Sequence, residues 1–508
     1  MKKLLLSTAA VLSLAAPSAA LADGPLSNVK HIIIVMQENH SFDNYFGALP
    51  YAPNSRYHKG NPICSASDHR CVDGLSCSQK GGSLVCSNSN IDVGPPTTVV
   101  TSFHSPTRCI VPDLDHGWLA SHQELNFSRP NSALANPLSD GFVRVNDATE
   151  QHDKGESPTE DSTISYFDQT DIPFYYHLAQ TFAISDRQFA SVVGPTIPNR
   201  FYLMAATSFG HLTTDDAVPP TTGGYKPITG TIFDLLDAHH VSWTDYFEDA
   251  PQALEFRLPD SHTLPIATFY AQAFGIGDPL PQVVFIDPDL GAEGTALEDD
   301  EHPPTDIQRG QWHVSDVVNA IRSGPYWKDS VIFITYDEHG GFYDHAKPPA
   351  ANQGGGRTPD GIAPGQCADL SNPPASERPG GGAECATNPI SPTDTSVLDA
   401  EALCPALKAN PTGPYPASCA SFDQLGVRVP FIAVSPFSKP GYVSHVARDH
   451  TAMLGMIEDR FIGGSPRSHL TGRDLHAASL EDMFDFTNAP SLHAAVGSAG
   501  PPAHDCTP

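Results

Sequence analysis

Apolar runs separated by polar loops recur along the chain, and they are of two kinds. Four short runs rich in β-branched residues are typical of strands buried on both faces: 32–36, 282–287, 331–336 and 429–434. Helix-like periodicity occurs in four longer stretches: 172–182, 231–239, 314–323 and 451–461. Strands that alternate with helices predict a mostly parallel sheet with helices on both faces. The expected fold class is therefore α/β.

One more helix is expected to begin near Pro198, because proline is favoured in a first turn and the apolar run 201–206 follows. Thr196 then lies just ahead of a helix N-terminus, where backbone N–H groups favour anions. This position allows two readings of Thr196. It is either a helix cap, the common role of such a residue, or a nucleophile placed where an anion binds.

Residues 1–22 have the pattern of a secretory signal peptide, which is not part of the fold. Lys2 and Lys3 precede an apolar run, and cleavage is expected after Ala22. We therefore expect a secreted or periplasmic protein in which residues 23–508 form a single catalytic domain. No later apolar run is long enough to span a bilayer, so no stable membrane insertion is expected.

The ten cysteines of the chain fall into local groups. In an exported protein this usage predicts disulfides, and the absence of a CxxC pair argues against a zinc ribbon or a redox motif. The groups mark two cysteine-rich insertions, at about 51–110 and 346–424. Pairing within each group is expected, and whether Cys109 pairs with the isolated Cys506 is left open.

The formal net charge of −30 restricts the partners. A chain so acidic repels nucleic acid and anionic lipid surfaces, so no nucleic-acid partner is expected. An anionic substrate is still compatible with this charge, because a metal ion can set the local field of a site. Nothing in the pattern indicates the oligomeric state.

Residues with oxygen donors directly follow two of the predicted strands. Glu38 and Asn39 come after the first strand, and Asp337 and Glu338 come after the third. In open α/β sheets, ligands bind at the carboxyl ends of the strands. Together with Thr196 these residues offer hard oxygen ligands, which favours Ca²⁺, Mg²⁺ or Mn²⁺ over zinc. The alternative for each pair is a polar loop after a core strand.

Four histidines lie in the polar segments between these elements: His116, His302, His445 and His450. Beside an oxygen-ligated metal, histidines suit phosphoryl transfer, because they hydrogen-bond phosphate oxygens or protonate a leaving group. A threonine hydroxyl becomes a nucleophile only when a metal or a base lowers its pKa. Each histidine also has a simpler reading, as a residue that braces a loop or begins a helix.

Five stretches occur in order between residue 31 and about residue 461: QENHSFDNYFG, GPTIPNR, EHPP, YDEHGGFYDH and SHVARDHTAMLGMIEDRF. They resemble the signature blocks of the bacterial phosphoesterase family of phospholipases C and related acid phosphatases, within the alkaline-phosphatase-like superfamily. The resemblance implies an α/β/α sandwich with a mostly parallel central sheet. The two cysteine-rich insertions are not part of the family's pattern, and they leave lipid specificity open.

The resemblance also implies roles for individual residues. The positions that match its metal site are Glu38, Asn39, Thr196, Asp337 and Glu338. Thr196 matches the nucleophile, and the histidines that match phosphate-contacting catalytic residues are His116 and His302. The candidates for substrate binding are Asn199, His339 and His445. The resemblance does not imply the identity of the divalent metal.

We therefore expect an exported, metal-dependent phosphoric-ester hydrolase of the phospholipase C type with a threonine nucleophile. Its substrate is expected to be a phosphoester, either a phospholipid or a soluble phosphomonoester. The first alternative is a broad-specificity acid phosphatase acting on phosphomonoesters, and an alternative of another class is a non-catalytic secreted binding protein. A sulfatase-like esterase is disfavoured, because those enzymes convert a Cys or Ser to formylglycine and the corresponding residue is Thr196.

Overall fold

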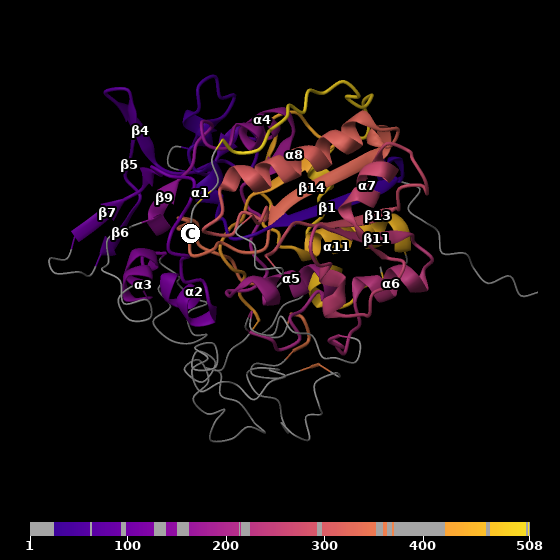
Figure 1. The fold of residues 1–508 in the computed structure, drawn as a ribbon. Helices are drawn as coiled ribbons and strands as arrows, with labels where there is room; N and C mark the ends of the chain where they lie inside the picture. The colour runs from indigo at the N-terminus through magenta and orange to yellow at the C-terminus, as the bar shows by residue number, and fades with distance from the viewer. Residues whose placement is uncertain are drawn as a thin grey trace, which may run out of the picture.

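The computed structural model of the chain shows a central sheet with helices on both faces (Figure 1). The structure describes residues 25–60, 63–92, 98–125, 139–149, 162–212, 214, 224–291, 297–351, 359–362, 368–369, 422–463, 468–503 and 506. This arrangement confirms the expected α/β class.

Eight strands form the central sheet within the described residues. Their bounds are β1 (His31–Gln37), β10 (Ala183–Ser185), β11 (Trp243–Phe247), β12 (Thr263–Pro265), β13 (Val283–Asp287), β14 (Ser330–Tyr336), β15 (Phe431–Val434) and β16 (Val443–Ser444). The strand order is β12-β11-β13-β1-β14-β15-β10-β16. Neighbours pair in parallel, except that β15 is antiparallel to both β14 and β10. The sheet is thus mostly parallel, as predicted.

Different helices cover the two faces of this sheet (Figure 1). Their bounds are α4 (Pro173–Thr181), α5 (Thr196–Ala205), α6 (Ile232–Ala238), α7 (Ile266–Ala273), α8 (Ile307–Ser323) and α11 (Thr451–Ile457). Ile33 and Val35 of β1 belong to a core with α4, α7 and α8. Ile32, Ile34 and Met36 belong to a second core with α5, α6 and α11. Since both faces of β1 are buried, its sequence is continuously apolar rather than alternating.

Shorter elements complete the described fold. The remaining α-helices are α1 (Phe42–Phe46), α2 (Trp118–Glu124), α3 (Phe142–Thr149) and α12 (Gly472–Leu475). The 3₁₀ turns are Pro25–Asn28, Leu49–Tyr51, Ser162–Ile164, Gln252–Glu255, Trp327–Asp329 and Glu481–Met483. A π-helical segment, Glu458–Ile462, continues α11.

Some boundaries differ from those expected from the sequence. The helix expected from residue 314 begins at Ile307, because Asp306 caps it by accepting a hydrogen bond from the Gln308 backbone N–H at 2.9 Å. Its first turns are polar, so the apolar pattern marks only the second half. The helix α5 begins at Thr196 itself rather than after it. Four strands were not expected, because β10, β12 and β16 are very short and β11 (WTDYF) mixes polar with aromatic residues.

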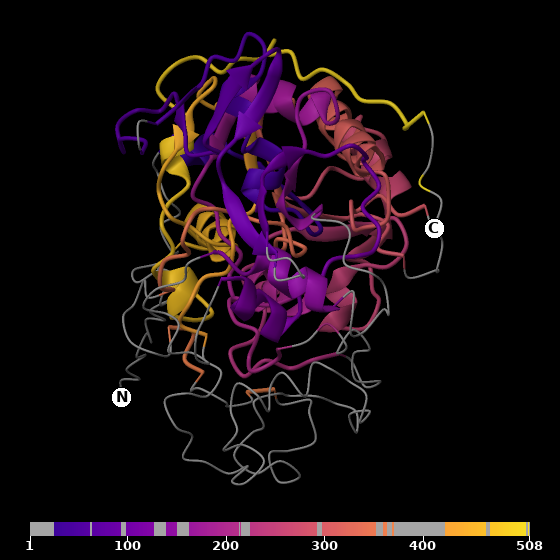
Figure 2. The ribbon, with the colours of Figure 1, turned by 90° about the vertical axis from the view of Figure 1, so that its left-hand side faces the viewer.

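The first insertion forms small ladders beside α2 and α3 (Figure 2). Its strands are β2 (His58–Lys59), β3 (Cys71–Val72), β4 (Cys77–Lys80), β5 (Ser83–Cys86), β6 (Ser89–Asp92), β7 (Thr98–Thr101) and β8 (Phe103–His104), and β8 pairs with β9 (Ser165–Tyr166). The disulfides are Cys64–Cys71, Cys77–Cys86 and Cys109–Cys506. Disulfides within the first cysteine group are therefore confirmed, and Cys109 does pair with Cys506.

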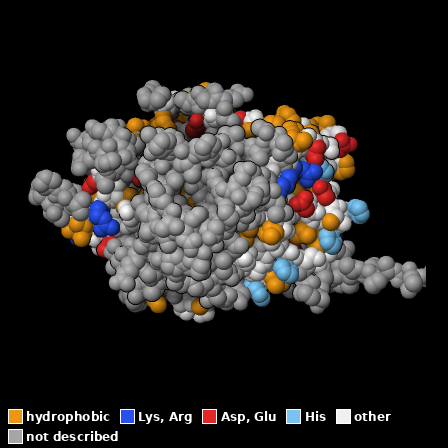
Figure 3. Space-filling view, turned by 90° about the horizontal axis from the view of Figure 1, so that it is seen from below, with side chains coloured by type: hydrophobic (Ala, Val, Ile, Leu, Met, Phe, Trp, Pro, Cys, Tyr) orange, Lys and Arg blue, Asp and Glu red, His pale blue; other side chains and the backbone are white. Residues whose placement is uncertain are grey.

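Two predictions fall on residues outside the described part of the chain. These are the signal peptide, 1–22, and most of the second insertion together with its four cysteines. No helix in the described ranges has the length and apolar character needed to cross a membrane. Seen from below, the described surface shows acidic, basic, histidine and hydrophobic side chains close together near its rim (Figure 3).

Candidate active site

The carboxyl ends of β1 and β14 meet at one edge of the sheet. The two strands are parallel neighbours, and Gln37 of β1 is paired with Tyr336 of β14. The residues that follow are therefore adjacent, and the Asn39 backbone N–H donates to Oδ1 of Asp337 at 3.2 Å. This pairing brings together the two pairs of oxygen donors expected from the sequence, Glu38 with Asn39 and Asp337 with Glu338.

Asn39 is held in an unusual conformation with an unused side chain. Its φ is +63°, a left-handed conformation that asparagine tolerates better than most residues. Its side-chain oxygen and nitrogen are buried without a hydrogen-bond partner among the described residues. The turn after β14 packs closely on it, since a Cβ at Gly340 would lie 2.3 Å from the Asn39 carbonyl oxygen. A buried amide without a partner costs about 1–3 kcal/mol, which points to a ligand at this position.

Arg200 ties the two strand ends together from the helix α5. Its Nε lies 3.0 Å from Oδ2 of Asp337, and its Nη2 lies 3.1 Å from Oε1 of Glu38. Burial opposes the charge of this guanidinium, but the two carboxylates outweigh burial and raise the pKa of Arg200. Burial also raises the pKa of Asp337 to about 7, against the opposing effect of Arg200. The edge therefore concentrates carboxylates around a single arginine.

Thr196 is the first residue of α5, and Pro195 occupies the cap position before it. Residues four apart on a helix lie on one face, so Thr196 lies on the same face of α5 as Arg200, the residue that contacts Glu38 and Asp337. Thr196 is nearly buried, and its hydroxyl makes no hydrogen bond with the described residues. The helix-cap reading of Thr196 therefore has no contact to support it here.

Asn199, a candidate for substrate binding, has its amide engaged inside the chain. Its Oδ1 accepts from the Val192 backbone N–H at 3.0 Å. Its Nδ2 donates to the carbonyl oxygens of Gly194 at 2.9 Å and Pro195 at 3.0 Å. These bonds fix the loop that leads into Thr196, so Asn199 braces the loop.

The two candidate catalytic histidines lie next to each other. The ring centroids of His116 and His302 are 6.0 Å apart. The Nδ1 of His116 donates to the Leu114 carbonyl at 2.8 Å, which leaves Nε2 facing Oε1 of Glu338 at 3.8 Å. The Nδ1 of His302 donates to the Pro303 carbonyl at 2.6 Å. Each histidine therefore keeps Nε2 for another partner.

Neighbouring carboxylates raise the pKa of both of these histidines. Burial lowers the pKa of His116, but Glu338 and Asp113 outweigh it and raise that pKa to about 10. Burial likewise opposes the charge of His302, whose pKa is raised by Asp113 and Glu38. Asp113, His116 and His302 lie close enough together to hold a metal, but a histidine ligates only when neutral. Protonated, the pair is suited to donate protons instead.

The other two histidine candidates occupy different places. The Nε2 of His339 lies 2.7 Å from Oε2 of Glu124, and its Nδ1 lies 3.1 Å from Oε2 of Glu338. His339 thus sits behind Glu338 and orients it. His445 instead hydrogen-bonds Asp186 at 2.8 Å and lies at the far strand β16. No contact within the described residues joins His445 to the β1–β14 edge.

Two further residues contact Asp337; sequence reasoning assigned no role to the first, and it grouped the second only with the other candidate histidines. The first is Arg200, whose signal was its spacing of four residues from Thr196. The other is His450, whose Nε2 donates to the Asp337 carbonyl at 2.8 Å and whose Nδ1 has no hydrogen-bond partner among the described residues. Burial lowers the pKa of His450 to about 4, so this ring is neutral.

The oxygen donors at this edge fit a divalent metal. Asn39 has a free amide oxygen, and Oε1 of Glu338 has no hydrogen-bond partner among the described residues. Glu38 and Asp337 add two carboxylates, and hard oxygen donors of this kind suit Ca²⁺, Mg²⁺ or Mn²⁺. Burial opposes the charge of Glu338, but His116 and His339 outweigh it and hold its pKa below the usual value. An ionised carboxylate is therefore available for a cation.

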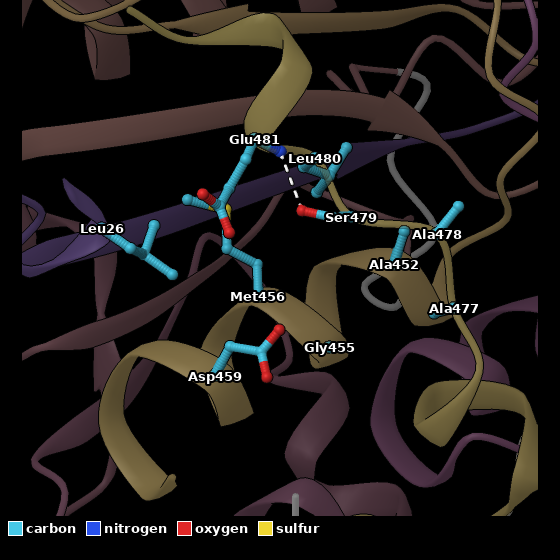
Figure 4. A pocket seen from close by; sticks show the side chains of 10 residues that line it. All are labelled: Leu26, Ala452, Gly455, Met456, Asp459, Ala477, Ala478, Ser479, Leu480 and Glu481. Atoms are coloured by element: carbon cyan, nitrogen blue, oxygen red, sulfur yellow. Dashed lines mark hydrogen bonds between the residues drawn. The ribbon is translucent and has the colours of Figure 1, made fainter. Parts of the chain in front are cut away.

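Two small cavities elsewhere in the fold are too small for a substrate. One lies by α11, between Leu26, Met456 and Glu481 (Figure 4). The other lies between β13 and α5, beside Asp245 and Asp287. Each has a volume of about 10 Å³, room for about one water molecule.

Comparison with known proteins gives one consistent result. The sequence profile of the Phosphoesterase family matches residues 29–462. Non-specific phospholipase C6 of Arabidopsis thaliana is 28% identical over 479 residues, which are 91% of this chain and 74% of that protein. Phospholipase C B of Mycobacterium tuberculosis is 26% identical over 506 residues, with 92% and 80% covered. Non-hemolytic phospholipase C of Burkholderia pseudomallei is 28% identical over 480 residues, with 86% and 56% covered.

Proposed function

Because the chain belongs to the Phosphoesterase family, and so hydrolyses phosphoric esters, we propose that it is a phospholipase C-type enzyme with Thr196 as its nucleophile. The relatives named above support the lipid diester as substrate class. The cluster of Thr196, Arg200 and the two strand ends supports the residue assignment.

In the first step, the Thr196 hydroxyl gives its proton to solvent and its oxygen attacks the phosphorus atom of the ester; the oxygen takes a proton back from solvent when the second step restores the hydroxyl. A bond forms between that oxygen and phosphorus, and the bond from phosphorus to the leaving alcohol breaks. The N-terminus of α5 and Arg200 place positive charge beside the phosphoryl oxygens. Water then attacks the phosphothreonine, which releases the phosphomonoester and restores Thr196.

The leaving alcohol needs a proton, and His116 and His302 are placed to give one. Both keep Nε2 directed away from their backbone hydrogen bonds, and both have a raised pKa, which favours the protonated form of the imidazole. A protonated imidazole acts as a general acid. The histidine that donated its proton in the first step takes a proton from the attacking water in the second step.

A divalent ion held by Glu38, Asn39, Asp337 and Glu338, when bound, would supply Lewis-acid polarisation and lower the pKa of the Thr196 hydroxyl. The chain itself orients these ligands. His339 positions Glu338, and Glu124 holds His339 from the other side. Arg200 keeps Glu38 and Asp337 at a fixed separation before any ion binds.

The observation that carries the proposal is the position of Thr196 on one helix face with Arg200. Arg200 contacts both strand ends, and the Thr196 hydroxyl on the same helix face makes no hydrogen bond with a described residue, which supports a role for it beside the oxygen donors. A non-catalytic binding protein would not require a free hydroxyl, an oxygen-donor set and two protonated histidines in one place.

An activity panel on purified protein tests the proposal. It compares phosphatidylcholine, p-nitrophenylphosphorylcholine and p-nitrophenyl phosphate, each with and without chelator. A phospholipase C favours the two diesters, whereas an acid phosphatase favours the monoester. Loss of all activity on diesters in fully metallated, folded protein would refute the lipid-diester assignment.

The nucleophile is tested by Thr196→Ala against a matched control, Thr231→Ala. Thr231 is a true helix cap, because its side chain and that of Asp234 form a capping box at α6. Removing a cap costs about 1 kcal/mol of stability and no catalysis, whereas removing a nucleophile costs several orders of magnitude in rate. Near wild-type turnover by folded Thr196→Ala would show that Thr196 is not the nucleophile.

Export is part of the same proposal. The N-terminal pattern and the disulfides support it, because disulfides persist in oxidising compartments. Detection of the mature protein in the periplasm or medium, beginning after residue 22, tests it directly. Retention of the intact chain in the cytosol would contradict it.

A further inference from the structure

A larger pocket opens at the edge of the sheet that carries the candidate active site, and Thr196 is not among the residues that line it. Its volume is about 400 Å³, within the range of small-molecule sites. Its polar wall carries Asp73, Arg187, Lys347 and His445, and its apolar wall includes Phe189 and Pro349. The combination of an apolar wall with convergent charged groups is typical of a ligand site rather than a packing void.

The pocket belongs to strands other than those of the candidate active site. Arg187 follows β10 and His445 follows β16, and these strands run in the same direction as β14. Their carboxyl ends therefore open at the same edge as the candidate active site. With strands about 4.8 Å apart, β10 lies roughly 10 Å from β14, so the two sites are neighbours without overlap.

The charged groups around the pocket have both signs and form one network. Asp73 is paired with four cationic side chains: Arg187 at 2.7 Å, His345 at 3.2 Å, Lys59 at 3.4 Å and Arg428 at 4.0 Å. The other carboxylates in this network are those of Asp43 and Asp344. A further carboxylate, Asp186, pairs with His445 of the pocket wall at 2.8 Å, so positive side chains are concentrated here in a protein whose net charge is −30.

Lys347 adds a further positive charge at the rim of the pocket. Its side chain is exposed, and it makes no ion pair with a described residue. Arg187 is partly exposed beside it, and its bond to Asp73 leaves other N–H donors of the guanidinium free. An anion that enters the pocket therefore meets an arginine and a lysine that are not fully neutralised.

We infer that this pocket is a second anion site that binds a phosphomonoester, with the phosphate at Arg187 and Lys347 and the organic part against Phe189 and Pro349. The volume exceeds that of a phosphate ion alone, which favours an ester over free phosphate. The choice of phosphate over another anion rests on the proposed function, because that reaction releases phosphomonoesters beside this pocket. The preference for an anion rests on the positive side chains of Arg187 and Lys347 in the pocket wall.

Equilibrium dialysis of labelled glycerol 3-phosphate against the metal-loaded, full-length enzyme tests the inference. Wild-type protein is expected to bind at two classes of site. Lys347→Gln is expected to weaken one class by about fivefold or more, and the matched surface variant Lys328→Gln is expected to change neither. Ala447→Trp, which fills the pocket, should remove the same class of site.

The arms of the experiment separate the sources of the anion. Inorganic phosphate should compete several-fold less well than glycerol 3-phosphate, because it cannot reach the apolar wall. Equal competition by glutarate, a dicarboxylate, would overturn the phosphate assignment. Binding unchanged in Lys347→Gln overturns the site itself, whether or not Ala447→Trp folds.

The outcome is independent of the catalytic proposal. Lys347→Gln should keep kcat/KM on p-nitrophenylphosphorylcholine within about twofold of wild type, because Lys347 lies outside the candidate active site. If Lys347→Gln weakens one class of binding site but the wild-type protein has no phosphoesterase activity, the pocket is supported and only the proposed function is refuted. Unchanged binding in an active enzyme would refute only the pocket.

Discussion

His345 links the first insertion to the central sheet, and its replacement by Gln is expected to destabilise the protein in a pH-dependent way. Its Nδ1 bonds Oδ2 of Asp43 at 2.5 Å, and its Nε2 bonds Oδ1 of Asp73 at 3.2 Å. Asp43 belongs to α1 beside the sheet, and Asp73 belongs to the insertion. Glutamine at this position keeps a polar side chain but cannot carry the charge.

The magnitude follows from the pKa of His345. Burial opposes its charge, but Asp43 and Asp73 outweigh burial and raise the pKa from 6.5 to about 9. One pKa unit corresponds to about 1.4 kcal/mol, so a rise of about 2.5 units sets an upper limit of ~3.5 kcal/mol. Because Arg428 shares the same carboxylates and the imidazole is one-fifth exposed, we expect about 2 kcal/mol.

The sign of the pH dependence is fixed by the raised pKa. A histidine whose pKa is higher in the folded state stabilises the fold fully below its unfolded pKa of 6.5. That contribution is lost as the pH rises through about 9. The destabilisation by His345→Gln should therefore be largest near pH 6 and shrink to the residual hydrogen-bond loss near pH 10.

Urea unfolding under non-reducing conditions at several pH values measures this difference. The matched control is His58→Gln in the same insertion, whose exposed pair with Asp68 at 3.2 Å is worth at most about 1 kcal/mol. A free-energy difference for His345→Gln that is constant with pH, or that grows between pH 6 and 10, would refute the reasoning.

Three further predictions concern the buried carboxylates. Exhaustive chelation should abolish activity, and Asn39→Ala should lower metal occupancy measured by elemental analysis; full activity in metal-free protein would contradict this. Arg200→Met should cost about 3–5 kcal/mol of stability in chelated protein, because it leaves Glu38 and Asp337 unpaired, and added metal should restore part of the melting temperature. Burial raises the pKa of Asp245, so Asp245→Asn should be relatively more stable at pH 8 than at pH 4 by about 1–2 kcal/mol; an equal effect at both pH values would contradict this.

The strands buried on both faces were predictable, and the reason is their position in the sheet. β1, β13 and β14 are central, so helices cover both faces and the sequence is continuously apolar. β12 and β16 are edge strands, and β10 and β16 are only three and two residues long. Segments this short show no recognisable hydrophobic periodicity. Their position in the sheet is set by pairing with strands that are distant in the sequence.

The oxygen-donor pairs were also predictable, because each directly follows a central strand. Their proximity required only that β1 and β14 be parallel neighbours. The ion pairs of Arg200 could not be read in the same way, since they depend on the orientation of α5 over the sheet. His445 was grouped with the other candidate histidines from the sequence, but the structure places it after β16, away from the ends of β1 and β14.

Histidine roles are decided by surroundings that the sequence does not display. His40 stacks between Tyr45 and Phe342, with ring centroids 4.3 Å and 4.9 Å away, and burial lowers its pKa to about 4. His116 is partly exposed, and Glu338 and Asp113 raise its pKa to about 10 against the opposing effect of burial. Both residues are close to polar motifs in the sequence, but burial lowers the pKa of the first, whereas carboxylates raise the pKa of the second. Aromatic neighbours hold an imidazole neutral, whereas carboxylates charge it, so the assignment of the catalytic acid depends on contacts made across the fold.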